Sequence, residues 1–231
     1  MDRLDKVLSS CGVSTRREVR DLVRKKRVSV NGREAEAADM KVAPSDKITV
    51  DGILVERMHP VTAVMNKISG YVTSTSDPES GTVMELLPER FVRLGLKPVG
   101  RLDKDTTGLL IFTNDGALAH HLISPKREVE KEYLVTHTGT LTDDIIAAFR
   151  DGLVLPDGTK CRSALLKREG EHQSLLVIRE GKYHQVKRMM GSVGLSVTAL
   201  ERVREGSITL SGLGRGETRE LTEDEIKSLL D

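Results

Sequence analysis

The sequence contains few large aromatic residues: among its 231 residues there are three tyrosines, three phenylalanines and no tryptophan. It also lacks any apolar run of the roughly 18–20 residues that a membrane-spanning helix requires. The first ten residues, MDRLDKVLSS, are charged from the second position and contain no apolar segment typical of a signal peptide. The two cysteines, Cys11 and Cys161, lie far apart without metal-type spacing, which favours free thiols in a reducing compartment. We therefore expect a globular protein of the cytoplasm.

An excess of charge of one sign is also missing, since the net charge is only +1. The charge is nevertheless unevenly distributed, because a basic cluster follows Ser14 and is opposed only by Glu18 and Asp21. Its members are Arg16, Arg17, Arg20, Arg24, Lys25, Lys26, Arg27 and Arg33. Such a cluster is typical of a local polyanion site or of a solvated helix face, and charge alone leaves both interpretations open.

The N-terminal segment predicts two short helices followed by a hairpin sheet. Apolar residues follow helical spacing from Leu4 to Leu8, and Thr15 with Glu18 forms a capping box that begins the second helix. Asn31-Gly32 and Asp51-Gly52 are strong hairpin turns between short strands, at 28–30 and at 47–50 with 53–55. We expect one small domain at 1–57, a linker at 58–60 and a larger domain at 61–231.

The segment RLDKVLSSCGVSTRREVRDLVRKKRVSVNG resembles the S4-like RNA-binding module of ribosomal proteins and RNA-modifying enzymes. The resemblance implies that the basic second helix and the turn after it hold structured RNA. The residues that it marks as RNA contacts are Arg16, Arg17, Arg20, Arg24, Lys25, Lys26 and Arg27.

Residues 61–231 mix strand and helix patterns without the regular alternation of a doubly wound fold. Strands are expected at 61–65, 109–113, 133–136, 174–178 and 208–210. Helices are expected at 117–123, after the N-cap Asp115, and at 185–193. The fold class is therefore α+β.

The polar segment GRLDKDTTGLL, from Gly100 to Leu110, leads directly into an apolar run. A neighbouring Arg101 or Lys104 would keep the Asp103 carboxylate ionised, and a positioned carboxylate suits nucleophilic catalysis at a sugar carbon. A capped, salt-bridged turn explains this segment equally well when it is taken alone.

Asp103-x-Asp105-x-Thr107 also matches the signature of haloacid-dehalogenase-like phosphatases. That chemistry needs an apolar parallel strand just before the first aspartate, and Pro98 and Gly100 argue against one. The six histidines form no metal-ligand spacing, so we expect no metal site.

The longer stretch GRLDKDTTGLLIFTNDG closely resembles the catalytic motif of pseudouridine synthases of the ribosomal small-subunit type. KEYLV at 131–135 and EGKYHQVKRMM at 180–190 resemble two further motifs of this family, in the same order. The resemblance implies a mixed, mainly antiparallel sheet and the isomerisation of uridine to pseudouridine within RNA, without a cofactor. It also implies that Asp103 is catalytic, that Tyr133 stacks on the target base and assists proton removal at C5, and that Lys187 pairs with Asp103. The remaining substrate-binding candidates are Arg101, Lys67, His184 and Arg188.

One turn departs from the family pattern: where Asn-Lys-Pro-x-Gly is common, this chain has Asn66-Lys67-Ile68-Ser69-Gly70. The segment HQVKRM and the short acidic C-terminal end favour a uridine of small-subunit ribosomal RNA as the target. A uridine of large-subunit ribosomal RNA is the alternative substrate. A ribosome assembly factor that binds RNA without catalysis is the alternative from another functional class. A monomer is expected.

Overall fold

The computed structural model describes residues 1–56 and 60–230, which form two compact units, Met1–Pro60 and Val61–Asp231. Most of the predicted linker at 58–60 lies outside the described residues. No helix in the described part of the chain has the length and apolarity needed to cross a membrane.

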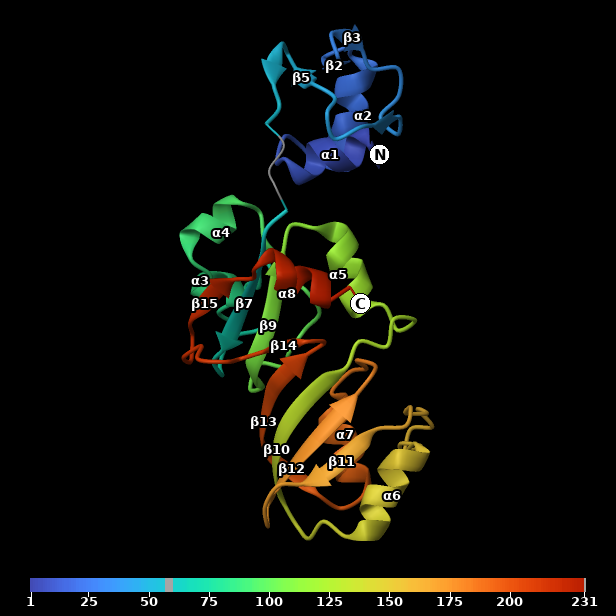
Figure 1. The fold of residues 1–231 in the computed structure, drawn as a ribbon, viewed down its shortest axis with the longest axis vertical. Helices are drawn as coiled ribbons and strands as arrows, with labels where there is room; N and C mark the ends of the chain where they lie inside the picture. Colours follow the sequence, from blue (N-terminus) through green and yellow to red (C-terminus); the bar gives the residue numbers. More distant parts are fainter. Residues whose placement is uncertain (57–59, 231) are drawn as a thin grey trace. The chain divides into compact units, whose positions relative to one another are not determined.

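The N-terminal unit consists of two helices and short antiparallel strands (Figure 1). The helices are α1 (Leu4–Ser10) and α2 (Arg16–Arg24). The strands are β1 (Asp2–Arg3), β2 (Val28–Val30), β3 (Arg33–Glu34), β4 (Lys41–Val42), β5 (Ile48–Val50) and β6 (Ile53–Leu54). One sheet has the order β3-β2-β5-β6, and β1 pairs with β4. The predicted helices and both predicted hairpins are confirmed.

Local sequence signals explain the elements of this unit. Thr15 accepts a hydrogen bond from the Glu18 amide, and the Glu18 carboxylate accepts one from the Thr15 amide, which completes the predicted capping box. The turn residues Asn31 and Asp51 have φ values of 53°, and each is followed by a glycine of positive φ. This geometry is the one that tight hairpins require. The helices bury their apolar stripes against the sheet, so the arginines of α2 remain on the surface.

The second unit is built on a nine-stranded sheet with the central order β11-β12-β10-β13-β9-β7-β15. Its strands are β7 (Thr62–Lys67), β8 (Lys97–Pro98), β9 (Thr107–Thr113), β10 (Lys131–Thr138), β11 (Leu165–Arg168), β12 (Gln173–Ile178), β13 (Ser196–Glu205), β14 (Ile208–Thr209) and β15 (Thr218–Glu220). Within the described residues, β9 and β13 pair in parallel and the other pairs are antiparallel. The predicted α+β class with a mixed, mainly antiparallel sheet is confirmed.

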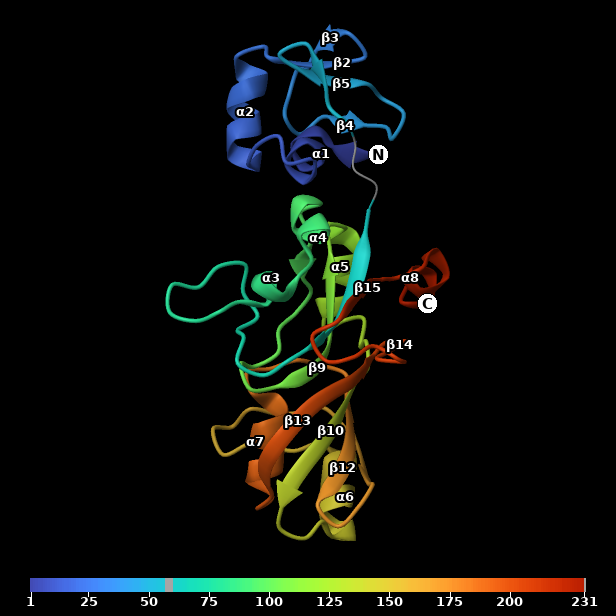
Figure 2. The same ribbon diagram turned by 90° about the vertical axis from the view of Figure 1, so that its left-hand side faces the viewer.

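Helices cover both faces of this sheet (Figure 2). They are α3 (Val83–Leu86), α4 (Glu89–Arg93), α5 (Gly116–Ile123), α6 (Asp143–Asp151), α7 (Gln185–Ser192) and α8 (Glu223–Ser228). Strand β9 sends Leu110 and Phe112 into the core that includes apolar residues of α3, α4, α6 and α7. Its alternate residues Leu109 and Ile111 enter a second core beneath α5. Burial on both faces accounts for the continuous apolar run that follows the aspartates.

The parallel pairing of β9 with β13 depends on Gly108. Its φ is 98°, and a Cβ atom at this position would lie 2.2 Å from the Arg202 carbonyl oxygen. Only glycine permits this approach, which brings β13 beside the loop that contains Asp103.

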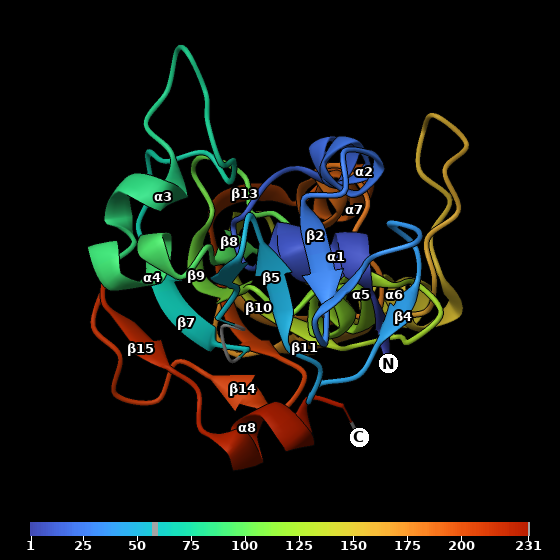
Figure 3. The same cartoon turned by 90° about the horizontal axis from the view of Figure 1, so that it is seen from above.

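The loop between β7 and α3 extends away from the sheet (Figure 3), and Lys104 Nζ donates a hydrogen bond to Ser80 Oγ of this loop at 3.1 Å.

Candidate active site

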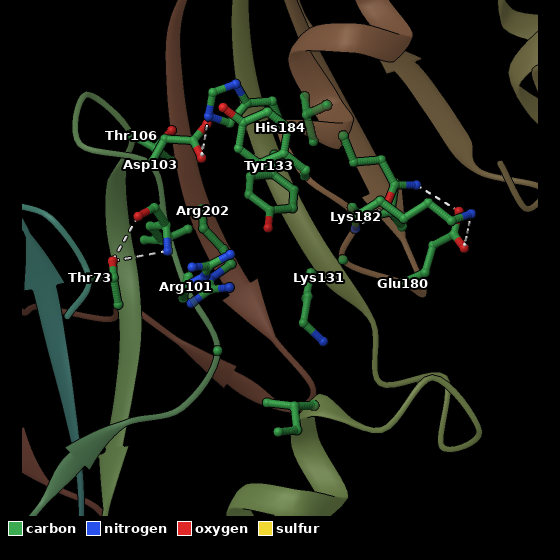
Figure 4. A pocket seen from close by; sticks show the side chains of 18 of the residues that line it. Thr73, Arg101, Asp103, Thr106, Lys131, Tyr133, Glu180, Lys182, His184 and Arg202 are labelled. Atoms are coloured by element: carbon green, nitrogen blue, oxygen red, sulfur yellow. Dashed lines mark hydrogen bonds and ion pairs between the residues drawn. The ribbon is translucent and has the colours of Figure 1, made fainter. Parts of the chain in front are cut away.

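A cavity of about 630 Å³ lies in the second unit (Figure 4). Three segments supply most of its lining: the loop before β9, the adjoining parts of β10 and β13, and the loop from β12 into α7. The structure thus brings together five residues that the sequence marked: Arg101, Asp103, Tyr133, His184 and Lys187.

Lys67, at the end of β7, organises the Asp103 loop from beneath. Its side chain is fully buried, and Nζ donates hydrogen bonds to the carbonyl oxygens of Asp103, Lys104 and Thr106 at 3.2, 3.2 and 2.8 Å. A fourth contact joins Nζ to the carbonyl oxygen of Ile68 at 3.1 Å. Burial lowers the pKa of Lys67 to about 8, although Asp105 and Asp103 oppose this effect. Lys67 therefore fixes the backbone of the loop.

The Asp103 side chain meets a cation from α7. Lys187 Nζ lies 3.2 Å from Asp103 Oδ2 and 2.6 Å from Asp105 Oδ1, so the predicted Asp103–Lys187 pair forms. Partial burial lowers the pKa of Lys187, but hydrogen bonds to Asp105 and Asp103 raise it above its ordinary value overall. The hydrogen bond from Lys187 also lowers the pKa of Asp105. The cation is therefore retained at neutral pH.

His184 lies on the other side of the same carboxylate. Its Nε2 is 3.5 Å from Asp103 Oδ1, and its backbone adopts left-handed φ and ψ values of 45° and 37° at the N-cap of α7. A left-handed conformation costs a non-glycine residue on the order of 1–3 kcal/mol. The start of α7 thus places two groups, His184 and Lys187, against Asp103.

Tyr133 projects from β10 into the cavity and is 7% exposed. Figure 4 shows its ring between the Asp103–His184 side of the cavity and the side that holds Arg202 and Lys131. Burial raises the pKa of the Tyr133 phenol, while the adjacent Arg202 guanidinium opposes that rise. The phenol is therefore protonated at neutral pH.

Beneath Tyr133 is a buried group of charges that sequence reasoning missed. Arg202 of β13 is 2% exposed and Glu205 is 1% exposed, and Arg202 Nη2 lies 3.1 Å from Glu205 Oε2. Arg202 Nε also donates to the Leu109 carbonyl oxygen at 2.7 Å, and Lys131 Nζ lies 3.5 Å from Glu205 Oε1. A buried ion pair is strongly destabilised when one partner is removed. Arg202 and Lys131 line the cavity, and Glu205 pairs with both of them from behind the lining.

Two of the predicted substrate contacts are not brought to the cavity. Lys67, which was predicted to bind the substrate, lies beneath the loop and does not line the cavity. Arg188 is also absent from the lining, because its guanidinium binds the Asp157 carboxylate at 2.5 Å on the outer side of α7. Arg101 does line the cavity, is exposed, and makes no ion pair or hydrogen bond with other described residues.

The basic residues of the N-terminal unit divide into two sets. Among the seven predicted RNA contacts, three are paired with acids: Arg24 with Asp21 at 2.7 Å, Lys26 with Glu34 at 3.1 Å, and Arg27 with Asp51. Within the described residues, the exposed side chains without an ion pair or hydrogen bond include Arg17, Arg20 and Lys25. Sequence alone could not separate the two sets, because Glu34 and Asp51 are brought close only by the hairpins.

The chain matches two known families in sequence. Residues 61–192 match the family described as RNA pseudouridylate synthase, and residues 2–48 match the S4 domain. The ribosomal small subunit pseudouridine synthase A of Escherichia coli (strain K12) is 42% identical over 99% of this chain and 100% of the relative. The ribosomal large subunit pseudouridine synthase B of Bacillus subtilis (strain 168) is 34% identical over 99% and 96%, respectively.

A solved structure agrees with the sequence comparisons. It is described as a pseudouridylate synthase, superposes with a TM-score of 0.71 and shares 32% sequence identity. The alignment covers 99% of this chain and 100% of the solved chain.

Proposed function

Because the chain belongs to the RNA pseudouridylate synthase family and carries an S4 domain, we propose that its substrate is a uridine of small-subunit ribosomal RNA. The Asp103–Lys187 pair facing Tyr133 within one cavity carries the catalytic part of this proposal, and the similarity to relatives named for the small subunit carries the choice of RNA. Relatives named for the small ribosomal subunit are 42% identical to this chain over nearly its full length. We place the enzyme in the cytoplasm and propose that it acts as a monomer.

The proposed reaction moves uracil from one point of attachment to another. The bond between C1′ and N1 breaks, the base rotates, a bond forms between C1′ and C5, and the C5 proton is lost as N1 gains one. Asp103 supplies the carboxylate, either as the nucleophile at C1′ or through a glycal intermediate. Lys187 pairs with this carboxylate and balances its charge as the glycosidic bond breaks.

The cavity suits a base that has left its stack. Flipping a nucleotide out of structured RNA costs a few kcal/mol, and stacking on an aromatic ring recovers part of that cost. Tyr133 provides such a ring, with Arg202 and Glu205 fixing its surroundings. Since the phenol is protonated at neutral pH, it accepts the C5 proton only when its own proton passes to N1 of the base, and the adjacent Arg202 guanidinium stabilises the phenolate between the two transfers.

The remaining roles follow from position. Arg101 is exposed at the cavity without an ion-pair partner in the described residues, so it binds a phosphate or the target nucleotide. His184 contacts Asp103 and orients it. Lys67 acts as a positioning residue for the loop rather than as a substrate ligand.

Large-subunit ribosomal RNA is the second candidate substrate. It is favoured by the 34% identity to a relative named for that subunit. The chemistry of the cavity is the same for either RNA, so only the choice of uridine separates the two candidates.

Mapping pseudouridine in both ribosomal RNAs tests the proposal. Each RNA is incubated with the wild type and with Asp103→Asn, and the sites are read at nucleotide resolution. We expect one new site in small-subunit RNA that is absent with the variant. A site confined to large-subunit RNA would overturn the choice of substrate. An RNA-binding protein without catalysis would give no site in naked RNA or in ribosome assembly intermediates.

A further inference from the structure

Tyr183 is exposed although large aromatic side chains are usually buried. The three phenylalanines are fully buried, Tyr133 is 7% exposed, and Tyr71 is partly buried against the core. Tyr183 is 71% exposed and lines the mouth of the cavity. Full burial of a side chain of this size would stabilise the fold by about 1.5–3 kcal/mol, and the exposed Tyr183 side chain does not provide this stabilisation. The exposed position of Tyr183 therefore indicates that its ring binds another molecule.

One face of the Tyr183 ring is already held in place. It stacks on His184 with ring centroids 3.9 Å apart and an angle of 18° between the planes. His184 is itself held in a left-handed conformation, and its side chain makes no capping hydrogen bond to α7. The strained backbone thus supports the stack and the contact with Asp103 rather than the helix.

The backbone of Tyr183 is also fixed, while its other ring face is open. Arg188 donates a hydrogen bond to the Tyr183 carbonyl oxygen at 3.3 Å and is anchored to Asp157. The phenol oxygen has no hydrogen-bond partner among the described residues. Because few degrees of freedom remain to be lost, the ring is preorganised to receive a flat group on its open face.

The charges that line the cavity indicate which kind of flat group binds to the Tyr183 ring. Arg101 and Lys104 line the same cavity as Tyr183 and make no ion pair with other described residues, so a polyanion is attracted to it. A nucleobase combines a flat face with an attached phosphate, and stacking on an aromatic ring suits any base.

We propose that Tyr183 stacks on the nucleobase adjacent to the target uridine in the RNA strand. This inference rests on the proposed function and extends it to a neighbouring nucleotide. Flipping the uridine removes one stacking partner from each neighbouring base, and Tyr183 replaces that partner at the cavity mouth. Tyr133 holds the flipped base deep in the cavity, whereas Tyr183 holds the strand from which that base has departed.

A cycle of paired changes in protein and RNA tests this proposal. The RNA is a small-subunit ribosomal RNA fragment that contains the mapped uridine, either intact or with an abasic nucleotide on its 5′ or 3′ side. The proteins are the wild type, Tyr183→Ala, Tyr183→Phe and the control Val154→Ala. Val154 is 63% exposed and does not line the cavity.

On intact RNA, Tyr183→Ala is expected to lower kcat/KM by roughly 5- to 150-fold, which corresponds to about 1–3 kcal/mol for one stacked base. Tyr183→Phe keeps the ring and should stay within about threefold of the wild type, as should Val154→Ala. An abasic nucleotide on one side should lower wild-type kcat/KM by a similar factor, and it should have no further effect on Tyr183→Ala.

Three outcomes would overturn the proposal. The first is an abasic effect of equal size in the wild type and in Tyr183→Ala, since the ring then contacts neither neighbour. The second is an equal loss in Tyr183→Phe and Tyr183→Ala, which assigns the effect to the hydroxyl. The third is a loss confined to kcat with no coupling to either neighbour, which assigns it to the positioning of His184 and Asp103.

Wild-type turnover on intact RNA separates this inference from the proposed function. If the wild type forms no pseudouridine, the proposed function fails. Stacking is then read from 2-aminopurine placed beside the uridine, whose fluorescence the wild type should quench and Tyr183→Ala should not. If the wild type turns over normally but the effects of Tyr183→Ala and of the abasic nucleotide are independent, the stacking role of Tyr183 is contradicted and the proposed function is not.

Discussion

The two units of this protein use cationic side chains in opposite ways. In the N-terminal unit, Arg17, Arg20 and Lys25 are exposed and make no ion pair within the described residues. In the second unit, Lys67 and Arg202 are buried and are bonded to carbonyl oxygens or to a carboxylate. An exposed cation keeps its water until a phosphate displaces it, whereas a buried cation fixes the groups around it. We therefore expect the same residue types to bind RNA in one unit and to fix the surroundings of Asp103 and Tyr133 in the other.

The largest effect is expected from breaking the buried pair beneath Tyr133. Arg202→Met leaves the buried Glu205 carboxylate with Lys131, 3.5 Å away, as its remaining cation, so the free energy of unfolding should fall by about 3 kcal/mol. Arg93→Met is the matched control, because Arg93 pairs with Glu89 on the surface with about three quarters of each side chain exposed. Its cost should be under about 1 kcal/mol. Urea denaturation measures both, and equal losses would contradict the assigned roles.

The second-largest effect is expected from replacing Lys67, which supports the backbone of the Asp103 loop. Lys67→Met removes the donor to the carbonyl oxygens of Asp103, Lys104 and Thr106, so the Asp103 carboxylate is held less firmly. A displacement of about 1 Å at a reacting group costs on the order of 100-fold in rate. We expect a single-turnover rate lower by about that factor with RNA affinity retained. If Lys67 contacts the substrate instead, the dissociation constant will rise with the loss of rate.

Sequence patterns predicted most of the N-terminal unit because its signals are local. The capping box of Thr15 and Glu18 and the two turns at Asn31 and Asp51 each act within a few residues. The family motifs likewise marked Asp103, Tyr133 and Lys187, which the structure places in one cavity. Local chemistry and a long motif were sufficient at these positions.

The strand β13 was missed for a physical reason. Its sequence, SVTALERVRE, shows no clean alternation, because Arg202 and Glu205 occupy buried positions that apolar residues usually fill. Their burial is possible only through the partners that β9 and β10 supply. The helix at 143–151 and the short elements α3, α4, β11, β15 and α8 were also not predicted. Buried charge and non-local pairing thus set the limit of the sequence analysis.

A third test separates the paired cations of the N-terminal unit from the unpaired ones. Replacing Arg17, Arg20 and Lys25 together by Ala should weaken RNA binding roughly tenfold or more and reduce the salt slope of log K by about 2–3. The control replaces the paired residues Arg24, Lys26 and Arg27, which already neutralise acids, and it should have a smaller effect. Binding titrations between 50 and 200 mM salt measure both slopes. The opposite ranking would show that ion pairing in the free protein does not select the RNA contacts.

The smallest effect concerns two capping-box glutamates, one in each unit. Hydrogen bonds from Ser14 and Thr15 lower the pKa of Glu18 to about 2, and the hydrogen bond from Arg219 is the main cause of a pKa of about 2 for Glu225. Since both values lie below the ordinary 4.5, the stabilisation is present above pH 4.5 and is lost as pH falls towards 2. Glu18→Gln and Glu225→Gln should each make unfolding less dependent on pH in that window. Thermal melts between pH 2 and 5 measure the slopes, and unchanged slopes would contradict the prediction.

The separation of RNA binding from catalysis is tested most directly by measuring affinity and single-turnover rate on the same RNA for two variants. Asp103→Asn should lower the rate by at least about 1,000-fold while its dissociation constant stays at the wild-type value. The triple alanine variant at Arg17, Arg20 and Lys25 should raise the dissociation constant, and its rate should recover as the RNA concentration increases. Turnover by Asp103→Asn close to that of the wild type would contradict the account.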